Sequence, residues 1–377
     1  MSVNTKIDLR AHSLEVILGN QQESGAFLAC PNMGDYRFSW FRDGAYIAYA
    51  LTVDGSAASE VYKSSISAQW ENVFRFQNWC AQRINERSER VERAIAAVQA
   101  GNKPDMRDVL NARYRADGVE GPDDWPEFQL DGLGTWLWSL QVYVERFGFQ
   151  PVPTAWAQAA ELTARYLAAL WRVPCYDCWE ELGNDVHIST LATIYAGLQA
   201  AEKLISGTNY KATCAEIRAF VLEKGLTPTG ELAKSVGIDM VDANLLMVCT
   251  PHRLLAPDDP IMVKTVERIE RELHAKTGGL HRHLKDVYYG GGAWVLLELH
   301  LAWYYAEKGD LARAKVLLDW CETQANAQGD LPEQVITTML APDHYDPWVA
   351  QRGVIASPLL WSHAEYLIVK WKLAGLE

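Results

Sequence analysis

Apolar residues recur at spacings of three and four along nearly the whole chain, and this periodicity limits the fold more than any other feature. Two-residue alternation, the pattern of half-buried strands, is nearly absent. Gly148 and Gly207 stand just past two periodic segments, and Pro153 and Asp310 stand at the start of two others, as helix ends favour. The expected helices span Leu9–Gly19, Phe41–Val53, Ser59–Asn85, Gly132–Phe147, Pro153–Arg172, His187–Ser206, Asn209–Lys224, Val241–Val248, Pro260–Lys276, Ala293–Lys308, Leu311–Gln328 and Ser357–Ala374.

These helices predict an all-α fold. No Pro-, Gly- or Ser-rich linker divides the 377 residues, so we expect a single domain over residues 1–377. Helices that follow one another as hairpins without a linker fit one closed ring of helix pairs. The charged segment Glu86–Ala97 is predicted to be an exposed helix within an insertion at about 85–121.

The overall composition excludes several classes of partner. The net charge of −13 argues against nucleic acid or an anionic membrane surface. No run of about 18 apolar residues suggests a membrane span, and Met1–Asp8 lacks the apolar core of a signal peptide. Seven cysteines, an odd number spread over helical segments, suit a reducing compartment. We therefore expect a cytoplasmic protein that acts on a small neutral molecule, as a monomer or small homo-oligomer.

Two motifs place carboxyl groups in contrasting surroundings. In Trp179-Glu180-Glu181-Leu182, a like charge and an apolar ring both favour a protonated glutamate. In Leu331-Pro332-Glu333-Gln334, a stiff loop and a neighbouring amide suit a carboxylate that activates water. We expect Glu180 to titrate above an ordinary glutamate and Glu333 to be ionised at neutral pH. Two carboxyl groups with separated pKa values are what cleavage of a glycosidic bond needs. The alternative for the Glu-Glu pair is a solvated helix end.

Tryptophan and tyrosine are abundant, with 15 and 16 residues respectively. Aromatic rings pack against the C–H faces of sugars, and their N–H and O–H groups form hydrogen bonds. Most of these rings are expected to fill the core, and Trp136, Trp138, Trp171 and Trp303 lie in apolar helical stripes. The tryptophans beside charged residues or in irregular segments are candidates for a pocket: Trp40, Trp125, Trp179, Trp294 and Trp361.

Six segments in order resemble the motifs of glycoside hydrolase family 15, the glucoamylase-like enzymes. Tyr36 to Asp43 is similar to the family signature Tyr-x-x-x-Trp-x-Arg-Asp, and Asp177 to Glu181 is similar to its general-acid loop. Leu331 to Gln334 resembles the general-base loop. The other matching segments are Trp125 with Gln129 and Asp131-Gly132, Arg282 to Asp286 with Tyr288-Tyr289 and Trp294, and Trp361-Ser362.

The resemblance implies an (α/α)6 barrel, with Glu180 as general acid and Glu333 as general base. It implies that Arg42 and Asp43 grip the terminal glucose and that Arg282 and Glu181 contact the next sugar. Trp125 and Trp179 would pack on ring faces, with Tyr36 near the attacking water and Tyr288 as its partner. The remaining implied substrate-binding residues are Trp40, Asp131, Asp286 and Trp361. The sequence departs from the family pattern at Cys178, in Ser357–Leu360 and in the insertion.

Two other patterns have less specific meanings. Cys175-x-x-Cys178 is a redox or half-zinc spacing, but no second such pair follows. His274, His281 and His283 are candidate metal ligands, although such histidines more often form ordinary hydrogen bonds. No phosphate-binding or dinucleotide-binding glycine motif is present in the sequence. We expect neither a metal nor a cofactor.

The function expected from these features is that of an inverting, exo-acting α-glucosidase that releases β-glucose from short α-glucosides, isomaltose or small isomalto- or malto-oligosaccharides. The short substrate is expected because no export signal is seen, little chain precedes Tyr36 or follows the last helix, and the insertion could narrow the pocket. The alternatives are a trehalase with the same residues, a catalytically silent sugar-binding or regulatory module, and an isomerase that uses paired histidines.

Overall fold

The computed structural model describes residues 7–54 and 63–375, and most of these residues are helical. The α-helices are α1 (Leu9–Gly19), α2 (Phe41–Asp54), α3 (Lys63–Asn85), α4 (Ser88–Gln99), α5 (Asp131–Phe147), α6 (Thr154–Leu170), α7 (Ile188–Leu204), α8 (Lys211–Lys224), α9 (Pro260–Leu273), α10 (Val295–Glu307), α11 (Leu311–Glu322), α12 (Tyr345–Arg352) and α13 (Leu360–Leu373). Short 3-10 helices are η1 (Gly34–Tyr36), η3 (Ala243–Val248), η4 (Tyr288–Gly290) and η5 (Pro342–His344).

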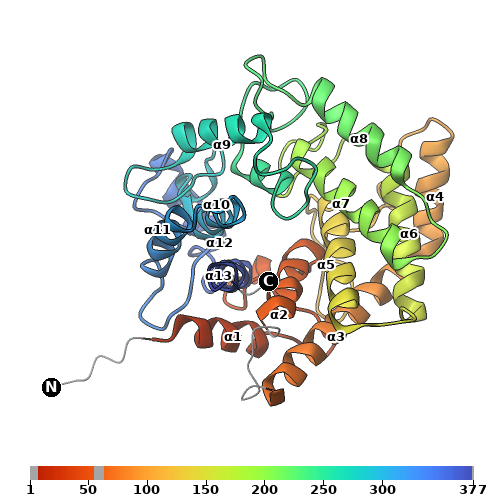
Figure 1. Ribbon diagram of the computed structural model, residues 1–377, viewed down its shortest axis with the longest axis horizontal. Helices are drawn as coiled ribbons and strands as arrows, with labels where there is room; N and C mark the ends of the chain where they lie inside the picture. Colours follow the sequence, from red (N-terminus) through yellow and green to blue (C-terminus); the bar gives the residue numbers. More distant parts are fainter. Residues whose placement is uncertain (1–6, 55–62, 376–377) are drawn as a thin grey trace.

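The helices form two concentric layers. The inner layer is a closed ring in which α2, α5, α7, η3, α10 and α13 contact one another in turn, and α13 returns to α2. The outer layer consists of α1, α3, α6, α8, α9 and α11, each packed against the inner ring from outside (Figure 1). This arrangement is an (α/α)6 barrel, so the predicted all-α fold class is confirmed.

The sequences of the helices agree with their layers. Every residue of α2 is buried, and residues 295–304 of α10 are buried as well, because each inner helix has neighbours on all sides. An outer helix buries one stripe only. In α9 the buried side chains include Met262, Val266 and Ile269, whereas the opposite face carries charged residues. Within the described residues, no helix is long and apolar enough to cross a membrane.

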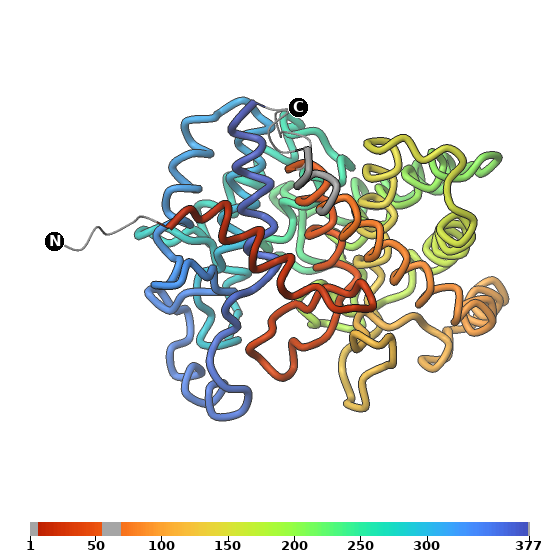
Figure 2. Tube along the Cα trace, turned by 90° about the horizontal axis from the view of Figure 1, so that it is seen from below, coloured from red at the N-terminus to blue at the C-terminus, as the bar shows by residue number. Residues whose placement is uncertain are grey.

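The loops that precede the inner helices gather at one end of the ring. Figure 2 shows this end, where loops from the early, middle and late parts of the chain lie on the side opposite to the C-terminus. Two short antiparallel strand pairs tie these loops together. β1 (Ser39–Trp40) pairs with β2 (Arg113–Tyr114), and β3 (Ala293–Trp294) pairs with β4 (Gln334–Val335). The segments just before α2 and α10 are therefore fixed to distant parts of the chain.

Most predicted helices are present, with shifts at their ends. Asp310 accepts a hydrogen bond from the Arg313 N–H at the start of α11, and Gly148 ends α5 in the left-handed conformation. The α-helix predicted at Val241–Val248 is instead the 3-10 helix η3, which begins at Ala243, and the start predicted at Ala293 is strand β3. The start predicted at Ser59 lies outside the described residues.

Helix α12 was not predicted. It has only eight residues, and its apolar stripe of Tyr345, Trp348 and Val349 is only partly buried, so the stripe is too short for periodicity to detect.

The segment 85–121 lies mainly on the outside of the ring. Its helix α4 packs against α6, and Arg87 and Arg90 pair with Glu120 at the end of the segment. The charged run predicted to be an exposed helix is thus helical, although the helix begins at Ser88 and ends at Gln99. The pairing of β2 with β1 and the contact of Ala112 with Trp40 bring this segment toward the end of the ring where the loops gather.

Two glycines allow α5 and α7 to cross closely, which generates a stability prediction. A Cβ added at Gly134 would lie 2.4 Å from the carbonyl oxygen of Thr193, and one at Gly197 would lie 2.8 Å from the Cα of Gly134. Gly134→Ala should lower the free energy of unfolding by about 1–3 kcal/mol, because overpacking of a tight core forces the helices apart. Urea denaturation followed by circular dichroism measures the change. Gly19→Ala is the matched control, since a Cβ there meets nothing within 4 Å, and unchanged stability of Gly134→Ala would contradict the prediction.

Candidate active site

A cavity of about 430 Å³ opens at the end of the ring where the inner helices begin. Its size falls within the range of pockets that bind small molecules. Nearly all the predicted site residues line it, although they come from segments far apart in the sequence. The predicted residues in its wall are Tyr36, Trp40, Arg42, Asp43, Trp125, Trp179, Glu180, Glu181, Arg282, Tyr288, Glu333 and Trp361.

Glu180 is held by indole donors in a tight loop, Asp177–Leu182, which we call the acid loop. Its Oε1 accepts hydrogen bonds from Trp125 Nε1 at 2.8 Å and Trp40 Nε1 at 3.0 Å. Its backbone is left-handed, with φ of 68°, a conformation that a residue other than glycine holds only when its surroundings enforce it. Burial raises the pKa of Glu180, although Arg42 and the indole donors oppose the shift, so the direction expected from the sequence is confirmed. Because Oε1 is occupied, Oε2 is the oxygen suited to carry a proton.

Glu333 lies in a different environment, in the loop Leu331–Gln334. Its Oε1 accepts a hydrogen bond from the Tyr36 hydroxyl at 3.0 Å, and the hydroxyls of Tyr36 and Tyr288 are 2.9 Å apart. Burial raises the pKa of Glu333 to about 8, although the Tyr36 hydrogen bond and the charge of Arg282 lower it. The expectation that Glu333 is ionised at neutral pH disagrees with this raised pKa. The sequence motif indicated a stiff loop but not that the carboxyl group would be almost completely buried.

Arg42 and Asp43, in the first turn of α2, form a buried polar pair in the cavity wall. Arg42 Nη1 donates to Gln129 Oε1 at 2.9 Å and to Asp131 Oδ2 at 3.0 Å, and its Nε lies 3.5 Å from Asp43 Oδ2. Burial raises the pKa of Asp43 to about 6, against the lowering effect of Arg42. This pair presents both a planar donor and a carboxylate acceptor to a ligand with adjacent hydroxyl groups.

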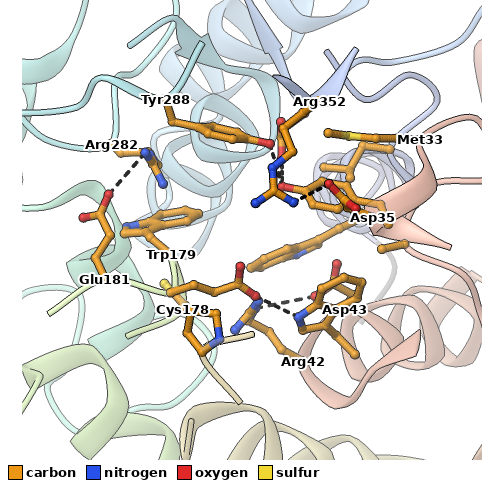
Figure 3. A pocket seen from close by; sticks show the side chains of 18 of the residues that line it. Met33, Asp35, Arg42, Asp43, Cys178, Trp179, Glu181, Arg282, Tyr288 and Arg352 are labelled. Carbon is orange, nitrogen blue, oxygen red and sulfur yellow. Dashed lines mark hydrogen bonds and ion pairs between the residues drawn. The ribbon is translucent and has the colours of Figure 1, made fainter. Parts of the chain in front are cut away.

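A second arginine and carboxylate pair stands on another side of the cavity. The Nη2 of Arg282 lies 3.4 Å from Glu181 Oε1 (Figure 3), and its Nε donates to Asp286 Oδ2 at 2.8 Å. Burial disfavours the charge on Glu181, but His283, Arg282 and Lys234 together hold its pKa well below its ordinary value. The Arg282 guanidinium also lies over three aromatic rings, those of Trp179, Tyr288 and Trp294, at 5.1–5.4 Å from their centroids.

Asp131 and Asp286 do not line the cavity. Each lies behind an arginine, with Asp131 bonded to Arg42 and Asp286 bonded to Arg282, so these two carboxylates orient the side chains that face the ligand. The sequence motifs placed both residues beside the site. They did not separate the residues in the wall from those that support it.

The mouth of the cavity contains residues that sequence reasoning missed. Arg352, at the end of α12, is paired with Asp35 on the side of the cavity opposite to Glu181 (Figure 3). Both side chains are about one-third exposed, unlike the buried groups of the floor. The ring of Trp125 has Arg113 at 3.8 Å and Arg352 at 5.5 Å from its centroid. No periodicity or motif pointed to Arg352, because its helix is only eight residues long and its apolar face is only partly buried.

The insertion and the remaining candidate motifs take on structural roles in the described part of the chain. No described residue of 85–121 lines the cavity, so the expectation that the insertion narrows the pocket directly is wrong; its Arg113 supports Trp125 from behind. Cys175 and Cys178 are free and buried. The three histidines have separate partners: His274 bonds Glu298, His281 bonds the Gly291 carbonyl and His283 bonds Glu181.

Comparisons with known proteins extend over the whole site. Residues 10–318 match the model of the glycosyl hydrolases family 15. An isomaltose glucohydrolase from Kribbella flavida is 38% identical over 376 residues, which cover 98% of this chain and 93% of that protein. A trehalase 2 from Sulfolobus acidocaldarius is 24% identical over 359 residues, 89% of this chain and 58% of that protein. A solved structure described as a wild-type glycosidase is 36% identical, with a TM-score of 0.89 and coverage of 98% of this chain and 97% of that one.

The raised pKa of Glu333 predicts how stability depends on pH. Between the ordinary value of 4.5 and about 8, the folded protein keeps a proton that the unfolded chain releases, so this group lowers the stability as pH rises through that window. Glu333→Gln removes the effect. The free energy of unfolding of the variant, relative to the unchanged protein, should therefore increase by up to about 1.4 kcal/mol for each pH unit between pH 5 and 8.

Urea denaturation at a series of pH values measures this difference. The control is Glu223→Gln. The Glu223 side chain is 71% exposed, so burial does not act on it as it does on Glu333. Stability curves that stay parallel for the unchanged protein and Glu333→Gln would show that the pKa of this carboxyl group is not raised.

Proposed function

The chain belongs to glycosyl hydrolases family 15 and is a glycoside hydrolase, and from this premise we propose that it is an inverting, exo-acting α-glucosidase that releases β-glucose from short α-glucosides, isomaltose above all. The observation that carries the proposal is that two carboxyl groups, the partly buried Glu180 and the buried Glu333, line one cavity and have different hydrogen-bond partners. The 38% identity to an isomaltose glucohydrolase supports the choice of substrate.

In the proposed mechanism, Glu180 is the general acid. Its Oε2 donates a proton to the glycosidic oxygen as the bond breaks, while the indole groups of Trp40 and Trp125 hold Oε1. The raised pKa keeps a larger fraction of Glu180 protonated than an ordinary glutamate would have. After proton transfer, the same indole N–H groups stabilise the carboxylate that forms.

Glu333 is the general base for a water molecule that attacks the anomeric carbon from the opposite face. Among the described residues, its Oε2 has no hydrogen-bond partner, and a water that donates to this oxygen would favour the ionised form. Burial also raises the pKa of the Tyr36 hydroxyl well above its ordinary value, so it stays protonated and donates to Oε1. Tyr36 thereby orients the base toward the water.

Two arginine and carboxylate pairs bind the substrate. Arg42 and Asp43 grip hydroxyl groups of the terminal glucose, and the Asp43 Oδ2 has no hydrogen-bond partner among the described residues, so it is free to accept from such a hydroxyl. Arg282 and Glu181 contact the second sugar. The ring of Trp179 packs against a sugar face.

The shape of the cavity favours short substrates. Its floor is formed by buried residues at the starts of inner helices, including Leu296 of α10 and Trp361 of α13, so a chain enters by its end. The Asp35–Arg352 pair narrows the mouth, where a third sugar would emerge.

We also propose the wider properties of the protein. Residues 1–377 form one catalytic domain, with an insertion at about 85–121 that supports Trp125. A cytoplasmic location is favoured by the seven cysteines, all free and buried. The reaction needs a carbohydrate as its partner and neither nucleic acid nor a membrane, and the protein acts as a monomer or small homo-oligomer.

The stereochemistry of the product tests the mechanism. Direct attack by water on an α-glucoside inverts the anomeric carbon, so β-glucose should be the first product seen by proton NMR during hydrolysis of isomaltose. Initial release of α-glucose would instead mean a covalent intermediate and would contradict the inverting assignment. No glucose release from any disaccharide would support the silent-module alternative.

Substrate length provides a separate prediction. kcat/KM should be highest for isomaltose and fall by roughly tenfold or more toward longer isomalto-oligosaccharides, because the narrowed mouth excludes further sugars. Arg352→Ala opens the mouth and should reduce this difference, whereas Arg107→Ala, a change at an arginine whose side chain is 89% exposed, is the control. Efficiency that rises with length toward dextran or soluble starch would overturn the prediction. A preference for trehalose would support the trehalase alternative.

A further inference from the structure

A buried lysine lies behind the wall of the cavity. Lys234 lies between α8 and η3, its side chain is 1% exposed, and it is not part of the cavity lining. Its Nζ lies 2.7 Å from Asp242 Oδ2, 2.9 Å from Asp177 Oδ2 and 3.1 Å from Glu181 Oε2. One ammonium group therefore joins three carboxylates that belong to separate segments of the chain.

One of these carboxylates, Asp177, holds the acid loop in its turn. Asp177 Oδ1 accepts hydrogen bonds from the backbone N–H groups of Trp179 at 3.0 Å and Glu181 at 2.9 Å. The Asp177 carbonyl accepts from the Glu180 N–H at 2.9 Å. These bonds surround the left-handed residue Glu180, so the position of its carboxyl group depends on the position of Asp177.

The other two carboxylates fix the residues on either side of Glu180. Asp242 bonds the side chain of Trp179, and the remaining carboxylate is that of Glu181 itself. Asp242 accepts hydrogen bonds from the indole Nε1 of Trp179 at 3.0 and 3.1 Å. Glu181 faces the cavity and also pairs with Arg282 and His283. Lys234 is thus linked to three consecutive residues. It reaches Trp179 through Asp242 and Glu180 through Asp177, and it pairs with Glu181 directly.

The acid loop depends on Lys234 because this lysine neutralises buried carboxylates that bind the loop. The side chains of Asp177 and Asp242 are fully buried. Among the described residues, Lys234 is the only cationic side chain within 4 Å of either carboxylate. A buried carboxylate without a counter-charge is unstable, and it takes up a proton or moves toward water. Either change would weaken the bonds from Asp177 to the acid loop.

We propose that Lys234 is a positioning residue for the general acid: through Asp177 and Asp242 it sets where the carboxyl group of Glu180 meets the glycosidic oxygen. This inference rests on the proposed function of Glu180 as the acid. Lys234 exchanges no proton with the substrate. Burial works against its charge, but Asp242, Asp177 and Glu181 together raise the pKa of Lys234 well above its ordinary value, so it stays charged at every working pH.

The test compares two substrates that differ in their need for an acid. Isomaltose needs its leaving oxygen protonated, whereas α-glucosyl fluoride releases fluoride, which leaves without prior protonation. Lys234→Met should lower kcat on isomaltose at least about tenfold more than kcat on the fluoride, as expected when general acid help of about 10²–10⁴ is partly lost. Lys234→Arg keeps the charge but displaces the donor atoms, and it should show the same selective loss to a smaller degree.

Two reference variants make each outcome decisive. Glu180→Gln should show the selective loss in full, and Lys224→Met, a change at an exposed lysine, should behave like the unchanged protein. Equal losses on both substrates in a folded Lys234 variant would overturn the positioning role. If Lys234→Met does not fold, Lys234→Arg decides by the same comparison. If Glu180→Gln itself shows no selective loss, the assignment of Glu180 as the acid fails, and the inference about Lys234 fails with it.

Discussion

A helix that is buried on every side needs other elements packed all around it, and α2 is such a helix. The remaining inner elements, α5, α7, η3, α10 and α13, close that ring and are covered in turn by the outer layer. The inner elements begin at the same end, so the polar residues of their first turns and preceding loops meet there. The N-termini carry partial positive charge, which favours the many carboxylates of the site.

The cations of the site are arranged in a repeated way. Arg42 and Arg282 face the cavity, and each is held from behind by a buried aspartate, Asp131 or Asp286. The arginine at the start of α2 would be disfavoured by the helix dipole without the nearby carboxylates. Each arginine therefore has one partner that fixes its orientation and a second carboxylate in the cavity wall, so that substrate meets donors and acceptors that are already ordered.

The helices and most residues of the cavity wall could be predicted from the sequence, because each is marked by a pattern of residues close together in the chain. The helices follow from a repeat of three and four residues, and the six ordered motifs, the one with Tyr36, Trp40 and Arg42 among them, contain most of the residues that line the cavity. Lys234 gives no such signal, since two of its partners lie 8 and 53 residues away and nothing in Ala233-Lys234-Ser235 marks it. The raised pKa of Glu333 depends on the burial of its side chain, which is a property of the assembled ring and not of its motif.

The closed floor of the cavity also governs what happens after each bond is cleaved. In the proposed mechanism, glucose is formed next to Arg42 and Asp43, deeper than the rest of the substrate, so it can leave only after the shortened chain has withdrawn through the mouth. Every turnover therefore ends in complete dissociation, and the enzyme cannot advance along a polymer without releasing it. In the same proposed mechanism, free glucose binds to Arg42 and Asp43 as the terminal sugar does, so the product would compete with the substrate as it accumulates, and the rate of hydrolysis would become linked to how fast glucose is removed.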